Sequence, residues 1–276
     1  MPLVFAAIAP HGGIAIAEAC APEERDVALK TRAGMEELGR RFAAARPEAV
    51  IVASPHNVHI SNAFGVIVAS RVAGSLDGVT PAIALDIGCD TELAWRVLES
   101  FGAAGLSAAG VSFGSNEPGT AVAPMDWGVL IPLWFMGGRN ESPAPLVVVT
   151  PARDLPASDH VTAGAAIAAA AAASDRRIAL IASADHGHAH ARTGPYGYHP
   201  AAAEYDGLVT AAVTNNRLED LTTFSRDLVE NAKADSWWQM LILHGATRGW
   251  RGELLSYEAP TYFGMITASY TPAVAS

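Results

Sequence analysis

The chain has 276 residues, of which 50% are apolar and 17% are charged, and such abundant apolar residues with sparse charge exclude a disordered chain. The 18 lysines and arginines against 28 aspartates and glutamates give a formal net charge of −10, which argues against nucleic-acid binding, since phosphate recognition depends on clustered lysine and arginine. Two cysteines are too few for a disulfide scaffold or a four-thiolate zinc site.

Short apolar runs alternate with segments of helical periodicity along the chain. Several of the runs are rich in Val and Ile without alternation, as strands buried on both faces are. In chain order the predicted elements are a strand over Leu3–Ile8, a helix over Glu23–Arg46, strands over Val50–Ala53, Phe64–Ala69 and Ala82–Ile87, a helix over Asp90–Phe101, a strand over Leu146–Val149, a helix over Ser158–Ala173, a strand over Ile178–Ala182, and helices over Leu218–Glu230 and Ser236–His244. This order predicts an α/β fold, a single domain over residues 1–276 with a central mixed sheet flanked by helices.

No apolar run is long enough to cross a membrane. The longest, Ala163–Ala173, is mostly alanine and falls short of the roughly 20 residues that a bilayer requires. The chain begins Met1-Pro2-Leu3 without the basic segment that opens a signal peptide. We therefore expect a cytoplasmic protein that does not contact a membrane.

Six of the nine histidines follow predicted strands. They are His11 after the first strand, His56 and His59 after the second, and His186, His188 and His190 after the last. In open α/β sheets ligands bind beyond the carboxyl ends of the strands, so these side chains are expected to converge there. Imidazole ligates zinc, iron, copper and nickel, and two histidines with one carboxylate form the facial site of non-haem Fe(II) oxygenases. The histidines therefore predict a metal site.

A zinc-dependent hydrolase is an alternative reading of the same histidines. The run from Asp185 to His190 superficially resembles the His-x-His-x-Asp-His string of metallo-β-lactamase-like hydrolases. The order differs, however, because Asp185 precedes the histidines here.

Taken together, these motifs resemble the class III extradiol ring-cleavage dioxygenases, the superfamily of the protocatechuate 4,5-dioxygenase catalytic subunit. The family has a histidine after the first strand, which His11 matches, and a Pro/Asp-His motif after the next strand, which Pro55-His56 matches. A Ser-Gly-x-x-x-His-like stretch is matched by residues 183–188, with His188 at its end. Residues 194–206 are similar to the Gly-aromatic and Phe-Asp elements of the family. The resemblance runs through nearly the whole chain.

The resemblance implies an Fe(II) enzyme that cleaves a catechol-type ring with O2. The substrate class would include catechol, protocatechuate-like compounds and aminophenols, and a homo-oligomer is expected. His11 and His56 would ligate Fe(II) with a carboxylate from the C-terminal third, and His188 would be the acid/base residue. His186 and His59 are candidates for a further proton donor.

Three residues are candidates for the metal carboxylate. Glu230 is the first choice, because it precedes a stretch that resembles the helix after the metal carboxylate in relatives. Glu258 is the second, and Asp235, which also fits the N-cap of the next helix, is the third.

One position departs from the family pattern. Trp127, in Met125-Asp126-Trp127-Gly128, occupies the place of a second acid/base histidine in an Asp-His-Gly element. We expect Trp127 and Tyr198 to contact the substrate ring and Arg192 to pair with a substrate carboxylate. A Memo-like binding protein without oxygenase activity is the alternative on the same fold, and relatives of that kind tend to carry a cysteine at the carboxylate position.

Overall fold

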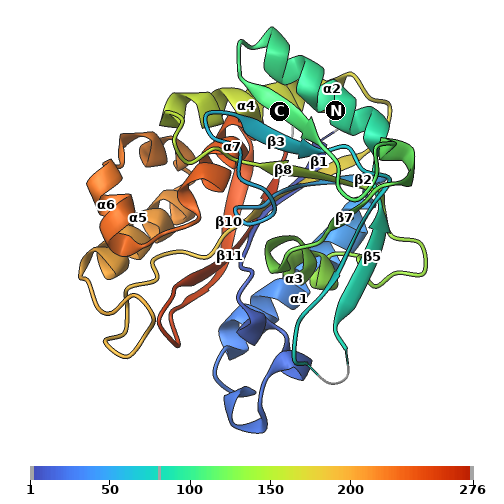
Figure 1. Ribbon diagram of the computed structural model, residues 1–276. Coiled ribbons are helices and arrows are strands. Elements are labelled where there is room, and N and C mark those ends of the chain that lie inside the picture. Colours follow the sequence, from blue (N-terminus) through green and yellow to red (C-terminus); the bar gives the residue numbers. More distant parts are fainter. Residues whose placement is uncertain (1–2, 80–81, 274–276) are drawn as a thin grey trace.

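A large mixed sheet runs through the middle of the molecule, with a smaller sheet beside it (Figure 1). The computed structural model describes residues 3–79 and 82–273, so the outermost residues of the domain predicted over 1–276 lie outside it. The large sheet of this described part consists of β1 (Leu3–Ala9), β2 (Ala49–Ala53), β3 (Phe64–Ile67), β6 (Ala108–Val111), β8 (Leu146–Thr150), β9 (Ile178–Ser183), β10 (Arg251–Glu258) and β11 (Met265–Thr271). The smaller sheet consists of β4 (Arg71–Ser75), β5 (Ala84–Gly88) and β7 (Val122–Pro124).

The strand order of the large sheet is β10-β11-β1-β9-β2-β8-β3-β6. The four central strands β1, β9, β2 and β8 are parallel to one another. The outer strand β11 is antiparallel to β1, and β3 is antiparallel to β8. Because the carboxyl ends of the central strands meet at one edge, the loops after β1, β2 and β9 are neighbours in space.

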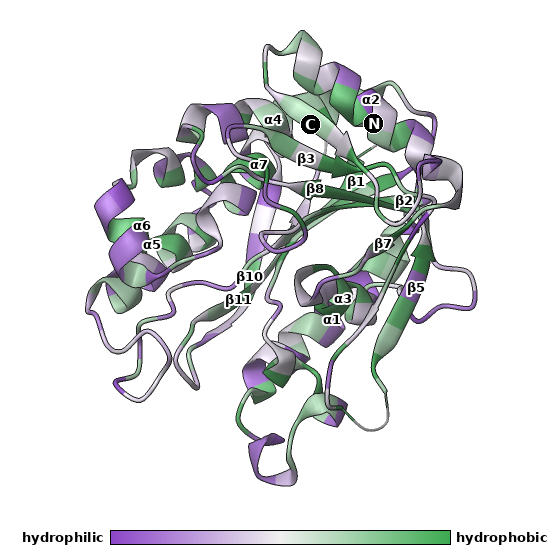
Figure 2. Cartoon of the chain, viewed as in Figure 1, coloured by the Kyte–Doolittle hydropathy of each residue, from purple (hydrophilic) through white to green (hydrophobic). Residues whose placement is uncertain are grey.

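Helices cover both faces of the large sheet (Figure 1). They are α1 (Leu29–Ala45), α2 (Thr91–Ala103), α3 (Trp127–Phe135), α4 (Ala157–Ala172), α5 (Ala201–Thr214), α6 (Arg226–Ala232) and α7 (Trp237–Ala246). Alternate residues of β1 enter two separate apolar cores: Ile8 belongs to the core that includes residues of α2, α4, α5 and α7, whereas Phe5 belongs to the core that includes residues of α1 and α3. Figure 2 shows the resulting hydrophobic character of the central strands.

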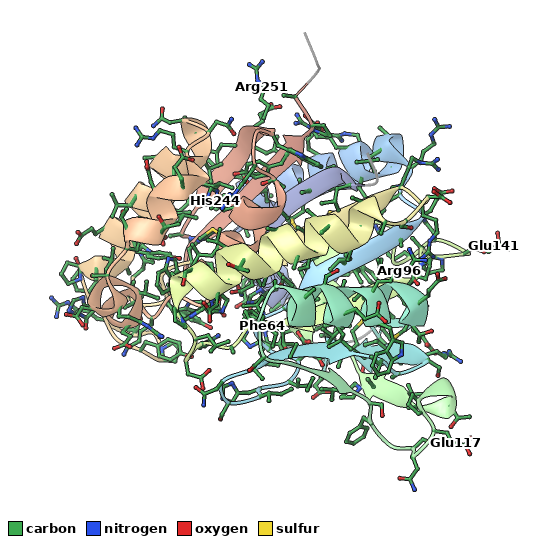
Figure 3. All side chains as sticks on the ribbon, turned by 90° about the horizontal axis from the view of Figure 1, so that it is seen from above. Phe64, Arg96, Glu117, Glu141, His244 and Arg251 are labelled. Atoms are coloured by element: carbon green, nitrogen blue, oxygen red, sulfur yellow. The ribbon has the colours of Figure 1, made fainter. Side chains whose placement is uncertain are left out.

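The alanine-rich helix α4 lies between α2 and α7 (Figure 3). A Cβ atom built on Gly164 of α4 would lie 1.9 Å from the Ile242 carbonyl oxygen, and one built on Gly245 of α7 would lie 1.9 Å from the Val161 carbonyl oxygen. Only residues without a side chain permit this approach of two backbones. The alanine tract is therefore a helix packed closely against α7.

The predicted fold class is confirmed, and the differences concern individual elements. All six predicted strands are present, but the run predicted at Ala82–Ile87 lies in the smaller sheet as β5. The helix predicted at Leu218–Glu230 is split into a 3₁₀ turn, Leu218–Thr223, and α6. Helix α1 begins later than predicted, at Leu29, after three short 3₁₀ turns.

The N-termini of α2 and α4 differ in their caps. Asp90 caps α2, since its carboxylate accepts a hydrogen bond from the Leu93 amide at 3.0 Å. The N-cap residue of α4 is Pro156, which offers no side-chain acceptor. None of the helices described is long and apolar enough to cross a bilayer.

Helix α4 also carries a buried histidine that links stability to pH. The His160 side chain is inaccessible to solvent, and its Nδ1–H donates to the Pro156 carbonyl at 2.9 Å. Burial lowers the pKa of His160 from 6.5 to about 4. The unfolded chain therefore binds more protons between these two values, and stability falls as pH falls through this window.

We expect His160→Gln to flatten the pH dependence of folding. The wild type should lose roughly 2 to 3 kcal/mol more than the variant between pH 7 and pH 4.5, because only the wild type carries this titration. Urea unfolding of both proteins at the two pH values measures the difference. Equal losses in the two proteins would show that His160 titrates normally in the folded state.

Candidate metal centre

Three side chains from distant parts of the sequence meet at the carboxyl edge of the sheet. His11 follows β1, His56 follows β2, and Asp235 precedes α7, and their ligand atoms all lie within 4.8 Å of one another. The two Nε2 atoms are 3.1 Å apart, and the Asp235 Oδ2 atom is 3.4 Å from Nε2 of His11 and 3.3 Å from that of His56. Ligands at right angles around an ion, each about 2.1 Å from it, are separated by about 3 Å. The three atoms therefore have the spacing of ligands on one face of a metal ion.

His11 is held rigidly by residues of the loop after β9. Its Nδ1 atom lies 2.9 Å from Ser183 Oγ, so its Nε2 atom is left to face the cluster. Its main-chain N–H donates to Asp185 Oδ1 at 3.0 Å, and Asp185 Oδ2 lies 3.5 Å from His11 Nε2. A hydrogen bond to the ring nitrogen that faces away from the metal, here Nδ1, is the usual way in which proteins orient a metal-binding histidine.

His56 is positioned by the start of helix α3. Asp126 caps α3 and also accepts hydrogen bonds from the Ser54 hydroxyl at 2.9 Å and the Asn57 side chain at 3.0 Å. These two bonds hold the residues on either side of the Pro55-His56 pair. The Trp127 ring packs against the imidazole of His56, with centroids 4.4 Å apart. Trp127 therefore lies beside the cluster and is half exposed.

The carboxylate in the cluster is Asp235, the third of the predicted candidates. Glu230 is exposed, because Val229 and Ala232 form the buried side of the short helix α6. Lys233 ends this helix in the left-handed conformation, with φ of 55°, and the reversal directs the following Asp235 inward. The helical periodicity of residues 226–232 places Glu230 on the exposed side of α6, and this pattern is the sequence signal that distinguishes Glu230 from Asp235.

Glu258, the second candidate, is also absent from the cluster. Its Oε1 atom accepts a hydrogen bond from the Thr31 amide at 2.7 Å. Thr31 is in the first turn of α1, whose N-cap, Ala28, has no side-chain acceptor. Glu258 thus satisfies one of the free amides that every helix N-terminus exposes.

The charges in the cluster favour a bound cation. Burial alone would lower the pKa of His11, but the carboxylates of Asp185 and Asp235 outweigh it and raise that pKa to about 9. Burial would raise the pKa of Asp235, but His11 and His56 hold it well below its usual range. Asp235 Oδ1 is buried and has no hydrogen-bond partner in the described chain. The negative charges of Asp185 and Asp235, which stabilise a proton on His11, would also stabilise a metal ion at this position.

His188 lies in the same pocket as the cluster. The pocket, of about 440 Å³, is lined by His56, Asp235, His188 and Tyr196, among others. The Nδ1–H of His188 donates to the His186 carbonyl at 2.7 Å, which leaves Nε2 free to exchange a proton. Its ring stacks on Phe263 with centroids 5.4 Å apart. Larger hollows of about 540 and 690 Å³ occur elsewhere, but no histidine lines either of them.

Four further predicted site residues do not line this pocket. His186 is fully buried, with its Nδ1 atom 3.0 Å from Ser236 Oγ, and burial lowers its pKa to about 4. His186 is therefore neutral and enclosed by other residues, so it does not reach a substrate in the pocket as the predicted proton donor would. His59 is exposed. Arg192 lies over the exposed ring of Tyr198, 5.6 Å from its centroid, and both are outside the pocket lining.

A buried carboxylate holds the loop that carries His188. Asp206 of α5 accepts hydrogen bonds from the Gly187 amide at 2.8 Å, from His190 Nε2 at 2.8 Å and from the Tyr257 hydroxyl at 3.0 Å. Burial, reinforced by Asp206, raises the pKa of Tyr257, so the hydroxyl stays protonated and able to donate. Asp206 thus fixes the loop after β9 on both sides of His188.

We expect Asp206→Ala to destabilise the protein by about 3 kcal/mol or more, because three donors, one of them buried, would lose the buried carboxylate that accepts their hydrogen bonds. The midpoint of urea unfolding measures this change. Glu204→Ala, at an exposed position of the same helix, is the matched control and should change stability by less than about 0.5 kcal/mol. Equal shifts in both variants would contradict the role assigned to Asp206.

The fold and the three ligand groups define an α/β protein with a candidate site of two histidines and one carboxylate. Residues 5–268 match the family described as the catalytic LigB subunit of aromatic ring-opening dioxygenase. The chain belongs to this family, as its motifs predicted.

Two known proteins are similar to the chain. A Clostridium acetobutylicum protein, Protein CA_C1420, is 24% identical over 253 residues, which cover 90% of this chain and 53% of that protein. The chain thus spans about half the length of this curated relative. The crystal structure of uncharacterized protein JW3007 from Escherichia coli K12 has a TM-score of 0.61 and 18% identity, and the match covers 96% of this chain and 99% of that one. At this identity the likeness supports the fold alone.

Proposed function

We propose that the protein is an Fe(II)-dependent extradiol dioxygenase that opens the ring of a catechol-type substrate with O2. The observation that carries the proposal is the cluster of His11, His56 and Asp235, whose ligand atoms are 3.1 to 3.4 Å apart. Two histidines and one carboxylate on one face of an ion, with open positions opposite, suit non-haem Fe(II) and its oxygen chemistry. Membership of the ring-opening dioxygenase family supports the same reaction class.

The donor set fits Fe(II) in charge and geometry. Two neutral imidazoles and one carboxylate leave an Fe(II) ion with one net positive charge, enough to attract a catecholate oxygen. When bound, Fe(II) would supply adjacent open positions for the catechol and O2 and would pass electrons between them. The protein's part is to hold these groups in place and to control protons.

His188 is the proposed acid/base residue. Its free Nε2 atom faces the pocket that also contains His56 and Asp235. It would accept the phenol proton as the catechol binds and return a proton when the ring opens. The rings of Tyr196, Tyr262 and Phe263 pack against His188 and would hold its imidazole in place during the proton transfer.

Comparing metals tests this proposal against both alternatives. The protein would be purified without oxygen, analysed for metal, and reloaded with either Fe(II) or Zn(II). Oxygen uptake and the yellow ring-cleavage product would then be followed with catechol, protocatechuate, gallate and 2-aminophenol. We expect turnover with Fe(II) alone.

Two results would contradict the proposal. Ester or amide hydrolysis by the Zn(II) form, without oxygen uptake by the Fe(II) form, would indicate a zinc hydrolase. Tight metal binding with no turnover of any catechol would indicate a Memo-like binding protein. Against that alternative, the cluster contains Asp235 and neither Cys20 nor Cys89.

The predicted homo-oligomer, the aromatic substrate and the cytoplasmic location remain part of the proposal. Size-exclusion chromatography with light scattering would measure the oligomeric state.

A further inference from the structure

Two cationic side chains line the pocket beside the candidate metal site. Arg153 comes from the connection between β8 and α4, and Lys233 is the residue that ends α6. Asp235, the carboxylate of the cluster, lines the same pocket, and so does Trp238, on which Arg153 packs. Lys233 is exposed and Arg153 is partly buried.

Neither cation is paired with a carboxylate in the described part of the chain. Arg40, Arg41, Arg71, Arg96, Arg176, Arg177 and Arg217 do form such pairs. The guanidinium carbon of Arg153 instead lies 4.8 Å from the centroid of the Trp238 ring. Stacking on an aromatic face orients the guanidinium plane but leaves the N–H groups at its edge free to donate to a planar anion.

The arrangement is unusual for a chain with a net charge of −10. Such a protein repels anions at a distance, so a pocket that binds an anion needs local cations. Two carboxylates line the same pocket, Asp235 and Glu230. Asp235 is engaged by His11 and His56, and Glu230 forms no ion pair with Arg153 or Lys233 within the described residues. The two cations thus remain available to a ligand.

We propose that Arg153 and Lys233 form a subsite for a carboxylate on the substrate ring. This inference rests on the proposed function, and it narrows the substrate to a catechol, or an aminophenol, that bears a carboxylate. The two ring oxygens would be held at the metal site and the carboxylate by the two cations. His188 and Tyr196 line the same pocket, whose volume of about 440 Å³ is in the size range of small-ligand sites.

The subsite replaces an expectation drawn from the sequence. Arg192 was the predicted partner of a substrate carboxylate, but it lies on Tyr198 outside the pocket lining. Binding of a substrate carboxylate should therefore depend on Arg153 and not on Arg192.

Anaerobic calorimetry of ligand binding tests the inference without turnover. The protein loaded with Fe(II) would be titrated with three catechols that differ in charge: 3,4-dihydroxybenzoate, uncharged 4-methylcatechol, and dopamine, which bears an ammonium group. We expect the affinity to fall in that order. In the double variant Arg153→Met/Lys233→Asn, 3,4-dihydroxybenzoate should bind at least about 10-fold more weakly, and 4-methylcatechol should change by less than about threefold. Asparagine suits the left-handed backbone at position 233.

A matched variant controls for net charge. Arg139 also lies 4.8 Å over a tryptophan ring, that of Trp134, and Lys30 is an exposed residue of α1. Neither lines the pocket, so Arg139→Met/Lys30→Gln should leave all three affinities unchanged. Retained binding of 4-methylcatechol by the pocket variant shows that it is folded.

The outcomes separate this inference from the proposed function. If the wild type binds 4-methylcatechol but shows no preference for 3,4-dihydroxybenzoate, or if the pocket variant weakens both ligands equally, the subsite is wrong while the catechol site stands. If the wild type binds none of the three catechols, both the subsite and the proposed function are rejected.

Discussion

Replacing Asp235 by asparagine is expected to remove the bound metal and to abolish ring cleavage. Asp235 supplies the only carboxylate of the cluster, and its Oδ2 atom lies within 3.4 Å of both histidine nitrogens. An amide has almost the same shape but carries no charge, and it is a poor ligand for Fe(II). Loss of a residue that merely orients a ligand costs 10- to 100-fold in metal affinity, so loss of the ligand itself should cost more than about 100-fold.

Metal analysis of the purified variant measures this effect directly. We expect less than about a tenth of the iron that the wild type retains at the same metal concentration, with an unchanged circular dichroism spectrum. Glu230→Gln is the matched control, because Glu230 lines the same pocket but is exposed and outside the cluster. It should keep full metal stoichiometry. Metal loss in Glu230→Gln and not in Asp235→Asn would reverse the assignment of the carboxylate.

The second large effect is expected at His188. His188→Ala should retain iron and bind a catechol, yet its rate of ring cleavage should fall by about 100- to 10,000-fold. The reason is that Nε2 of His188 is the free imidazole nitrogen in the pocket outside the cluster, held there by the bond from Nδ1 to the His186 carbonyl.

Steady-state kinetics with iron analysis on the same sample checks this prediction. His244→Gln, on α7 and outside the pocket lining, controls for the general effect of losing an imidazole. If His188→Ala kept the wild-type rate with full iron content, another group would have to move the proton. If it lost its iron instead, His188 would have to be a ligand.

Much of the fold could be predicted from the sequence, because the central strands carry a strong local signal. Runs such as Val50–Ala53 and Ile178–Ala182 are apolar at every position, and both lie in the middle of the sheet, covered on two faces. The strands β10 and β11 were missed, since polar residues such as Glu253 and Ser256 interrupt the first of them. These two strands pair with each other, and their place at the sheet edge depends on the long-range pairing of β11 with β1, which no local pattern encodes.

The candidate site was predictable where it follows strands and less so elsewhere. His11 and His56 end parallel strands, so topology alone brings them together. The carboxylate comes from a turn between two helices, where the left-handed Lys233 decides which acid points inward. The resemblance of the stretch after Glu230 to the helix that follows the metal carboxylate in relatives favoured Glu230, although the buried side of α6 already excludes it.

The role of Arg153 could not be predicted for a similar reason. Its position depends on the stacking of its side chain on Trp238, which is 85 residues further along the chain. Arg192 was predicted instead, as a bidentate donor to a substrate carboxylate. In the folded protein the aromatic partner of each arginine, Tyr198 or Trp238, determines whether its charge faces the pocket.

The measurement that tests the account most directly is the stoichiometry of oxygen uptake by the Fe(II) protein with a catechol. We expect one O2 consumed for each catechol, no release of hydrogen peroxide, and an acyclic product whose mass equals that of the substrate plus both oxygen atoms. Oxygen uptake that yields hydrogen peroxide and a quinone, or no uptake by protein that holds iron at His11, His56 and Asp235, would contradict it.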